Sequence, residues 1–270
     1  MDILRNYKKQ FDTNKETWNK KVAFHKESDF YNVNSFLKGK TSLNALELEE
    51  LGSVKNKSLL HLQCHFGLDT LSWARLGAKC IGIDISEEAI KKAQELASQL
   101  KLNSTFKACN VYDVSKEIKQ TFDIVFTSYG VVGWLPNLEI WAKIIAEKLN
   151  KGGVFYMAEF HPIVWMFDYL EEQPKIKYPY SGSEAIYEEY KGTYANTKAD
   201  MLSKEYGWNH GLGQVVTALA NAGLRVEFLR EHYQSPYNCL PNLKQNDDGL
   251  YVFEKNLFPI VYSIKAVKKA

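Results

Sequence analysis

Short apolar segments alternate with helical segments from Lys57 to Phe160, and this alternation leaves the chain few folds to choose from. The apolar runs show little of the alternation between apolar and polar residues that marks a strand with one solvated face. Such runs, separated by helices, are typical of a parallel sheet that helices cover on both faces. The segments are, in order, SLLHLQ, DTLSWARLG, KCIGID, SEEAIKKAQELASQL, TFKACN, FDIVFTS, NLEIWAKIIAEKLNKGG and VFYMAEF. The sequence therefore predicts an α/β fold with a doubly wound, mostly parallel, Rossmann-like sheet.

The segments on either side of this unit have a different character. Residues 1–52 are polar with scattered aromatic side chains at helical spacing, so we expect short helices that are stable only when docked on a larger body. Residues 53–270 are expected to form the main domain, with a cap inserted at about 161–210. In this insertion the aromatic, alternating stretch from Tyr178 to Tyr194 predicts an antiparallel hairpin. The late segments LRVEFLREH and FPIVYSIKAVKK are expected to pair as antiparallel strands at the end of the sheet.

The charge of the chain is nearly balanced, with 34 basic and 32 acidic residues and a formal net charge of +2. A duplex-binding protein usually shows a basic excess, so we expect no nucleic-acid partner. No apolar run approaches the roughly 20 residues that span a bilayer, and the start MDILRNYKKQFDTNKETWNKK lacks the pattern of a signal peptide. Four scattered cysteines without a C-x-x-C pair suit a reducing compartment. We expect a soluble, cytoplasmic protein without a membrane partner, either a monomer or a homodimer.

The turn after the first predicted strand, HLQCHFGLDT, carries the main functional signal. Ligands of open α/β sheets bind beyond the carboxyl ends of the strands, and Asp84 ends the second predicted strand. An acidic residue about 20 residues beyond the first turn can accept hydrogen bonds from ribose hydroxyls. Nicotinamide dinucleotides and S-adenosylmethionine both contain a ribose. Dinucleotides need G-x-G-x-x-G for close approach of the pyrophosphate, whereas this turn has only Gly67, which favours S-adenosylmethionine.

Five ordered motifs resemble those of the class I S-adenosylmethionine-dependent methyltransferases, and HLQCHFGLDTLSWARLGA with WNHGLGQVVTALANAGLR looks like a poorly characterised bacterial branch. LLHLQCHFG is similar to the family's first strand and turn, VLDLGCGTG, with His61 in place of an acid and with Gln63 and His65 in place of glycines. GIDIS, ACNVYD, FDIVFTSYGVVGWLPN and LNKGGVF match the second-strand end, the adenine-edge segment, the fourth strand with its loop, and the L-K-P-G-G turn. The resemblance implies a seven-stranded sheet and an N-terminal helical lid, formed by residues 1–52, over the cofactor.

The resemblance also implies which residues bind the cofactor S-adenosylmethionine. Asp84 is the expected ribose acceptor with Ile85 beside the adenine, and the side chain of Gln63 is expected to hydrogen-bond the methionine ammonium or carboxylate. The full expected set is Gln63, Cys64, His65, Gly67, Asp84, Ile85, Asn110, Val111, Ser128 and Tyr129. We expect no metal at His61, Cys64 and His65, because one lies in a strand and the others in a turn, so that their side chains do not converge.

Methyl transfer requires an aligned acceptor, exclusion of water and, for some acceptors, a base. His161, directly after the fifth predicted strand, and His210, at the start of a later helix, are the predicted catalytic residues. Trp134 after the fourth strand, with Trp18 and Tyr31 of the predicted lid, is predicted to bind substrate, since aromatic faces line apolar pockets and attract a sulfonium. Each of these residues also suits a purely structural role in packing, capping or hydrogen bonding.

These features predict an enzyme that transfers a methyl group in line to an oxygen, nitrogen or carbon of a small-molecule acceptor. One alternative is a non-catalytic S-adenosylmethionine-binding or sensor protein, which the altered turn allows. Another is a nicotinamide-dependent oxidoreductase, which the missing glycines disfavour. The chain reads TSYG after the fourth strand and has no N-P-P-Y-type segment there, which argues against a nucleic-acid substrate.

Overall fold

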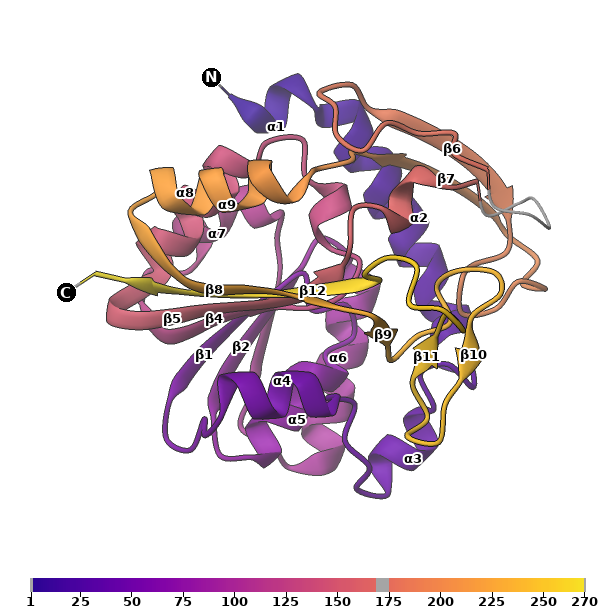
Figure 1. The fold of residues 1–270 in the computed structure, drawn as a ribbon. Helices are drawn as coiled ribbons and strands as arrows, with labels where there is room; N and C mark the ends of the chain where they lie inside the picture. Colours follow the sequence, from indigo (N-terminus) through magenta and orange to yellow (C-terminus); the bar gives the residue numbers. More distant parts are fainter. Residues whose placement is uncertain (1, 169–174, 270) are drawn as a thin grey trace.

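A seven-stranded sheet with the order β3-β2-β1-β4-β5-β12-β8 forms the centre of the computed structural model, which describes residues 2–168 and 175–269 (Figure 1). Its strands are β1 (Ser58–Leu62), β2 (Lys79–Asp84), β3 (Thr105–Ala108), β4 (Phe122–Thr127), β5 (Leu149–Phe160), β8 (Leu224–His232) and β12 (Val261–Lys268). The strands β1 to β5 pair in parallel, and β12 runs antiparallel to both β5 and β8. The predicted doubly wound, mostly parallel sheet and its final antiparallel pair are confirmed.

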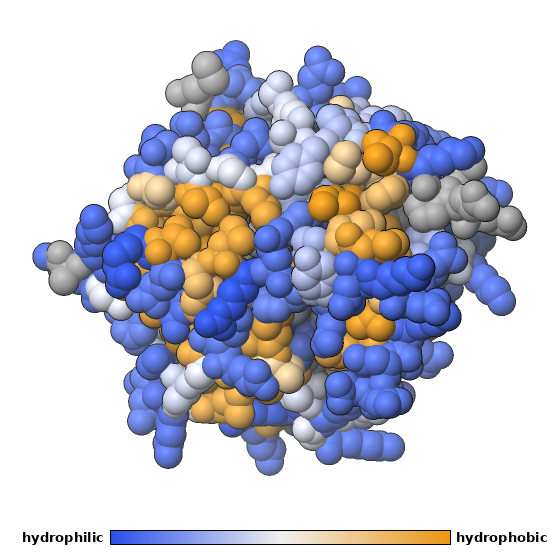
Figure 2. All heavy atoms as spheres, viewed as in Figure 1, coloured by the Kyte–Doolittle hydropathy of each residue, from blue (hydrophilic) through white to orange (hydrophobic). Residues whose placement is uncertain are grey.

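Helices cover both faces of this sheet, as the predicted alternation requires. They are α1 (Ile3–Asn6), α2 (Lys8–His25), α3 (Val33–Leu37), α4 (Ala45–Leu51), α5 (Leu68–Arg75), α6 (Glu87–Leu100), α7 (Val114–Glu117), α8 (Leu138–Lys148) and α9 (Leu212–Asn221). Successive side chains of a strand point to opposite faces, so Leu60 of β1 joins the core under α8 and α9 while its neighbour Leu59 packs with Trp73 of α5. Hydrophilic side chains cover most of the face in Figure 2, and apolar ones gather over the region of α8 and α9.

Two smaller sheets lie outside the main one. The hairpin of β6 (Ile186–Lys191) and β7 (Leu202–Gly207) is antiparallel, but only β6 falls within the stretch from Tyr178 to Tyr194 that predicted it. Strands β9 (Gln234–Ser235), β10 (Lys244–Gln245) and β11 (Tyr251–Val252) form a sheet where we predicted a loop. A strand of two residues is too short to show the pattern of apolar and polar residues from which strands are predicted, so these strands could not be recognised in the sequence. Residues 169–174 of the predicted cap at 161–210 lie outside the described residues.

The helix α2 packs beside the hairpin at the carboxyl ends of the parallel strands (Figure 1). One face of α2 meets β7 through Asn14, Thr17 and Lys21, and other residues of the helix, Phe11 and Val22, enter the hydrophobic cores. None of the helices in the described part of the chain has both the length and the apolar character of a membrane span. The role of residues 1–52 as a lid stays a prediction, although α2 lies where a lid would have to lie.

Candidate active site

The turn between β1 and α5 has the backbone conformation that glycines favour, although it contains only one glycine. Gln63, His65 and Gly67 have φ angles of 55°, 49° and 77°, so all three are left-handed. For a residue with a side chain this region costs roughly 1–2 kcal/mol, but His is among the residues that adopt it more often than most. Gln63 and His65 therefore adopt the left-handed backbone that glycine would adopt most readily at these positions.

Gly67 is kept because nothing larger fits there. A Cβ atom at this position would lie 2.5 Å from the ring of Phe106. Inside the turn, the Gly67 amide donates to the carbonyl of Cys64 at 2.9 Å, and the Cys64 amide donates to the carbonyl of Ile83 at 2.8 Å. The Cys64 side chain is buried in the core, so only its backbone belongs to the candidate site.

Asp84 ends β2 directly beside this turn. Its Oδ2 accepts a hydrogen bond from the His65 amide at 2.8 Å, and its Oδ1 accepts one from the Ser86 amide at 2.9 Å. Burial raises the pKa of the Asp84 carboxyl from its usual 3.8 to about 6, against the lowering effect of these amides. The group is therefore mainly ionised at neutral pH, and each oxygen keeps a lone pair that can accept from a ribose hydroxyl.

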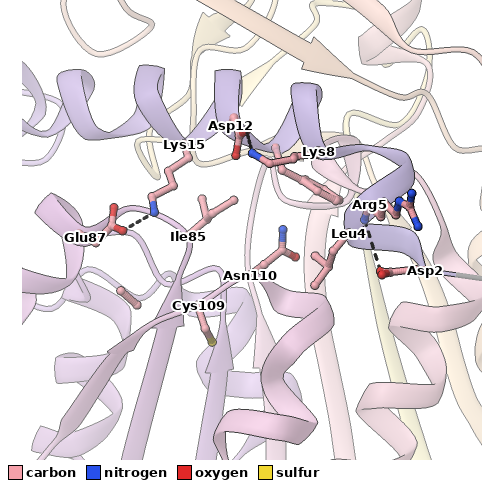
Figure 3. A pocket seen from close by; sticks show the side chains of 12 residues that line it. Asp2, Leu4, Arg5, Lys8, Asp12, Lys15, Ile85, Glu87, Cys109 and Asn110 are labelled. Atoms are coloured by element: carbon pink, nitrogen blue, oxygen red, sulfur yellow. Dashed lines mark hydrogen bonds and ion pairs between the residues drawn. The ribbon is translucent and has the colours of Figure 1, made fainter.

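A cleft of about 500 Å³ opens beside Asp84, between the ends of β2 and β3 and the helices α1 and α2 (Figure 3). Ile85, Cys109 and Asn110 line its sheet side, and Leu4 and Phe11 line its helix side. Its size is ordinary for a small-molecule site. Charged residues make up half of its lining, namely Asp2, Arg5, Lys8, Asp12, Lys15 and Glu87, and the apolar and amide side chains that suit an adenine ring lie on its sheet side. Of the predicted adenine-edge residues, Ile85 and Asn110 reach the cleft, whereas Val111 packs into the core.

The other end of the turn is covered by aromatic side chains. Trp18, His25 and Tyr31 pack around the His65 ring with centroid separations of 5.1–5.3 Å. The Gln63 side-chain amide donates to the Val131 carbonyl at 3.0 Å.

Several buried polar atoms at this end of the turn lack partners. Gln63 Oε1, His65 Nδ1 and His25 Nε2 are buried without a hydrogen-bond partner in the described structure. Since buried polar atoms are normally paired, these three fit a site that receives a polar ligand group. The cleft, the Asp84 carboxylate and these atoms together fit the adenosine and amino-acid parts of S-adenosylmethionine.

The loop after β4 is held by a carboxylate that the sequence reasoning missed. Glu159 of β5 is buried and accepts hydrogen bonds from the backbone amides of Gly130, Val131 and Val132, at 2.5–3.0 Å, and from that of Phe160. The feature of the sequence that could have pointed to Glu159 is its position as a single acidic residue near the end of the apolar segment VFYMAEF.

Three predicted residues of this loop lie in different surroundings. Ser128 lies beside the Asp69 carboxyl, and the Tyr129 ring packs against Phe160 and Tyr237. The Trp134 indole donates to the Gly130 carbonyl at 2.7 Å, and its ring meets Trp18 at 5.3 Å.

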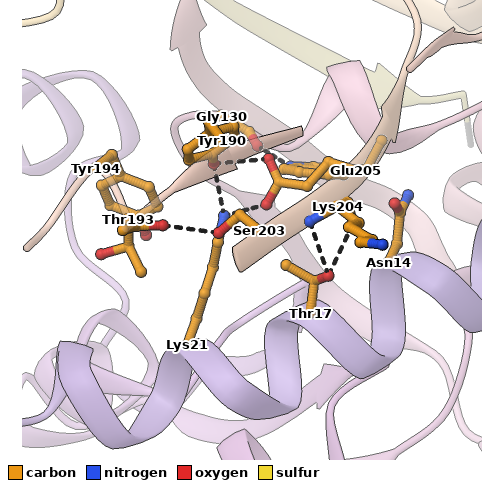
Figure 4. Close-up of polar contacts among 12 residues, drawn as sticks. Asn14, Thr17, Lys21, Gly130, Tyr190, Thr193, Tyr194, Ser203, Lys204 and Glu205 are labelled. Atoms are coloured by element: carbon orange, nitrogen blue, oxygen red, sulfur yellow. Dashed lines mark hydrogen bonds and ion pairs between the residues drawn. The ribbon is translucent and has the colours of Figure 1, made fainter. Parts of the chain in front are cut away.

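An ion pair between α2 and β7 was also missed (Figure 4). The Lys21 ammonium, 1% exposed, bonds the Glu205 carboxylate and lies 4.7–5.9 Å from the ring centres of four aromatic residues. These are Trp18, Trp134, Tyr190 and Tyr194. The rings, Lys21 and Glu205, which we call the aromatic chamber, bring together α2, the loop after β4 and the hairpin.

Two of the three predicted substrate residues, Trp18 and Trp134, belong to the aromatic chamber. The third, Tyr31, joins its edge, because its hydroxyl shares a hydrogen bond with that of Tyr194. No pattern in the sequence pointed to Lys21 or Glu205, which are 184 residues apart.

Neither of the two predicted catalytic histidines is part of this chamber, although His210 contacts the residue that follows Trp134. His161 is buried, its Nδ1 accepts from the Ile163 amide at 3.2 Å, and its Nε2 therefore carries the proton that it donates to Glu231 at 2.9 Å. His210 donates from Nε2 to the Leu135 carbonyl at 2.6 Å, next to Trp134, which leaves its Nδ1 lone pair able to accept a proton. Burial lowers the pKa of both imidazoles, so both are neutral at pH 7.

Comparison with known proteins supports the family seen in the motifs. Residues 53–210 match the family model of a methyltransferase domain. The chain is 32% identical over 102 residues to the mitochondrial ubiquinone biosynthesis O-methyltransferase of Homo sapiens, a match to 37% of this chain and 27% of that protein. It is 34% identical over 97 residues to an uncharacterized RNA methyltransferase of Clostridium tetani, a match to 36% of this chain and 21% of that protein. The chain thus spans well under half the length of these relatives.

A solved structure shows the same fold along most of the chain. It is an S-adenosylmethionine-dependent methyltransferase from Mesorhizobium loti, 16% identical, with a TM-score of 0.58 over 86% of this chain and all of that one. The family match covers more than half of the chain, and the sheet order and the turn at Gly67 agree with it. The chain belongs to the class I S-adenosylmethionine-dependent methyltransferases.

Proposed function

We propose that this methyltransferase acts on a small-molecule acceptor held in the aromatic chamber, next to the turn that binds the cofactor. The observation that carries this proposal is the burial of Lys21 and Glu205 among aromatic rings between α2, the loop after β4 and the β6–β7 hairpin. A site bounded by α2, the loop after β4 and the hairpin suits a compact acceptor, whereas a polymer needs an open, basic groove. The nearly balanced charge of the chain supports the same reading.

Other residues of the chain would bind the cofactor and shield the reacting atoms from water. S-adenosylmethionine supplies, when bound, a methyl group that its sulfonium has already activated. Asp84 would hold the ribose, and Ile85 and Asn110 would contact the adenine. Trp18 and Trp134 would exclude water and stabilise positive charge near the reacting carbon through their ring faces.

His210 is the better placed of the two predicted bases. Its Nε2 donates to the carbonyl of Leu135, the residue that follows Trp134 of the chamber in the sequence. Its Nδ1 has a lone pair that can accept a proton. His161 uses both ring nitrogens in hydrogen bonds, so a role as base would require one of them to break.

Transfer of label from methyl-tritiated S-adenosylmethionine tests the proposal. The purified chain is incubated with separate small-molecule, RNA and protein fractions of a bacterial extract, and label is measured in each. We expect label in the small-molecule fraction, with loss of transfer in Trp134→Ala. Label in RNA alone would contradict the small-molecule acceptor, and cofactor binding without transfer to any fraction would favour the sensor alternative.

A further inference from the structure

Two carboxyl groups, which we call the carboxyl pair, interact next to the cofactor turn. Asp69 is the second residue of α5, so it does not cap this helix, whose N-cap residue is Gly67. Its carboxylate accepts a hydrogen bond from the Ser42 hydroxyl at 2.6 Å. Glu47 of α4 is 1% exposed, and it accepts hydrogen bonds from the backbone amide and the side chain of Asn44 at 3.0 and 3.1 Å. Burial and the nearby Asp69 carboxylate together raise the pKa of Glu47 to about 7, so the two groups are electrostatically coupled.

The carboxyl pair has no positively charged partner. In the described part of the chain, no Lys, Arg or His side chain forms an ion pair with Asp69 or Glu47. The buried carboxylate of Glu205, by contrast, is neutralised by Lys21. A buried carboxylate without a counter-charge is costly, because no attraction offsets the loss of its hydration. The pair therefore has an excess of negative charge that a bound cation would neutralise.

Tyrosine side chains surround the carboxyl pair, and one of their hydroxyls is unused. The Tyr129 hydroxyl lies near the Glu47 carboxyl, yet it is buried without a hydrogen-bond partner in the described structure. The Tyr129 ring meets that of Tyr237 at 5.1 Å, and burial together with the nearby carboxyl pair raises the pKa of the Tyr237 hydroxyl. Buried polar atoms are normally paired, and aromatic ring faces attract cations. The unused hydroxyl, the rings and the excess negative charge complement an ammonium group.

The carboxyl pair adjoins the aromatic chamber. The Phe30 ring stacks on that of Tyr237 at 5.3 Å and meets that of Tyr194, a chamber residue, at 5.5 Å. Tyr31 shares a hydrogen bond with Tyr194 through their hydroxyls. Within the chamber, the ammonium and the carboxylate of the buried ion pair cancel each other's charge. An acceptor that extends from the chamber to the carboxyl pair therefore meets a net negative charge.

We propose that the carboxyl pair, with Tyr129, binds the ammonium group of the acceptor, so that the substrate class is an amine with a net positive charge. The ammonium donates hydrogen bonds to the Asp69 carboxylate and to the Tyr129 hydroxyl oxygen, and Glu47 adds to the attraction through its charge. The apolar part of the amine lies toward the rings of the chamber. This inference rests on the proposed function, because it assigns the small-molecule acceptor to one chemical class.

Separation of the acceptors by charge tests the substrate class. A cation-exchange resin at pH 7 divides the small-molecule fraction of a bacterial extract into compounds that bind, which have a net positive charge, and compounds that pass through. Each part is incubated with the wild-type protein and methyl-tritiated S-adenosylmethionine. We expect label in the resin-bound compounds and none in those that pass through.

Asp69→Asn tests the site itself, because asparagine keeps an acceptor for the Ser42 hydroxyl and removes the charge. We expect the amount of resin-bound fraction that gives half-maximal transfer to rise about tenfold or more, the scale of a hydrogen bond to a charged group. The affinities for S-adenosylmethionine and S-adenosylhomocysteine, measured by calorimetry, should both stay within about twofold of the wild type.

Two variants of α4 complete the experiment. Glu47→Gln removes the second charge and keeps the capping box at the start of the helix, and it should weaken transfer in the same direction as Asp69→Asn. Glu49→Gln makes the same chemical change at an exposed position of the same helix, and transfer should stay as in the wild type. Thermal unfolding of each variant confirms that it is folded.

Three results would overturn the proposal. Label only in compounds that pass through the resin, or unchanged transfer in both Asp69→Asn and Glu47→Gln, would mean that the pair binds no ammonium of the acceptor, and the proposed function would still stand. If Asp69→Asn weakened binding of S-adenosylmethionine but not of S-adenosylhomocysteine, the carboxyl pair would serve the sulfonium of the cofactor instead. Label in neither part of the small-molecule fraction would remove the acceptor of the proposed function together with this site.

Discussion

Lys21 of α2 and Glu205 of β7 form an ion pair inside the molecule, with 1% and 11% of their side chains exposed. The Tyr190 hydroxyl donates to the other oxygen of Glu205 at 2.9 Å, so both carboxylate oxygens are bonded. Beside the pair, the Asn14 side chain exchanges two hydrogen bonds with the backbone of Tyr206. The pair is therefore the charged centre of the contact that joins the N-terminal helix to the hairpin.

Removing one partner of this pair should destabilise the protein strongly. We expect Glu205→Gln to lower the free energy of unfolding by about 3–5 kcal/mol, because it leaves the Lys21 ammonium buried without a counter-charge. Denaturant unfolding followed by tryptophan fluorescence measures this. The double variant Lys21→Met/Glu205→Gln should recover much of the loss, since no buried charge is then left unpaired.

An exposed pair on the same helix provides the control. Lys8 and Asp12 are 73% and 61% exposed, and Lys8→Met should change the free energy of unfolding by no more than about 1 kcal/mol. If Glu205→Gln cost no more than this surface change, Lys21 and Glu205 would not be buried together in solution.

Asp84 should give cofactor binding a characteristic pH dependence. Its raised pKa of about 6 means that it takes up a proton as the pH falls from 7 to 5, and the protonated acid is a weaker acceptor for ribose hydroxyls. We expect the affinity for S-adenosylhomocysteine to fall as the pH drops through about 6. Calorimetric titrations from pH 5 to 8 measure the change.

Asp84→Asn is the matched variant for this titration. It should bind about tenfold more weakly at pH 7, from loss of a charge-assisted hydrogen bond, and its affinity should not change with pH near 6. A variant that kept both the wild-type affinity and the wild-type pH profile would show that Asp84 does not bind the ribose.

The sequence predicted the elements whose signals are local. Five apolar runs with helices between them became β1 to β5. Most residues of β1, β2 and β4 are buried, whereas β3, at the edge of the sheet, buries only Phe106. The turn could be aligned with that of the family through Gly67 and Asp84. A side chain at Gly67 would clash with the Phe106 ring, and Asp84 ends β2. Whether Gln63 and His65 would adopt left-handed φ angles was a question that only the structure could answer.

The missed parts of the site depend on contacts between distant segments. Lys21 looks like an ordinary surface lysine on a polar helix until β7 is placed against it. Glu159 looks like the exposed end of a strand, yet the loop at 130–132 surrounds it with amides. The pairing of His25 with His65 joins residues 40 positions apart through the packing of α2, which has no sequence signature.

Gly67 should tolerate no larger residue. We expect Gly67→Ala to lower the free energy of unfolding by about 2–5 kcal/mol, combining the left-handed φ of 77° with a clash against the Phe106 ring. Gly213→Ala in α9 is the control, because a Cβ there meets no atom within 4 Å, and alanine should stabilise the helix by about 0.5–1 kcal/mol. Equal effects of the two substitutions, measured by thermal unfolding, would contradict the conformation of the turn described above.

Replacing His161 and replacing His210 should affect the free energy of unfolding and kcat differently. His161→Ala leaves the Ile163 amide and the Glu231 carboxylate without their partner, and we expect it to lower the free energy of unfolding by about 1–3 kcal/mol. A positioned base contributes about 10²- to 10⁴-fold to a rate, so the two roles can be distinguished once an acceptor is known. Because both nitrogens of His161 are bonded, we expect its variant to keep kcat within a few fold, whereas His210→Ala loses at least tenfold if the acceptor must give up a proton. The reverse order in kcat, with His161→Ala properly folded, would mean that the bond to Glu231 opens during turnover and that His161 is the base.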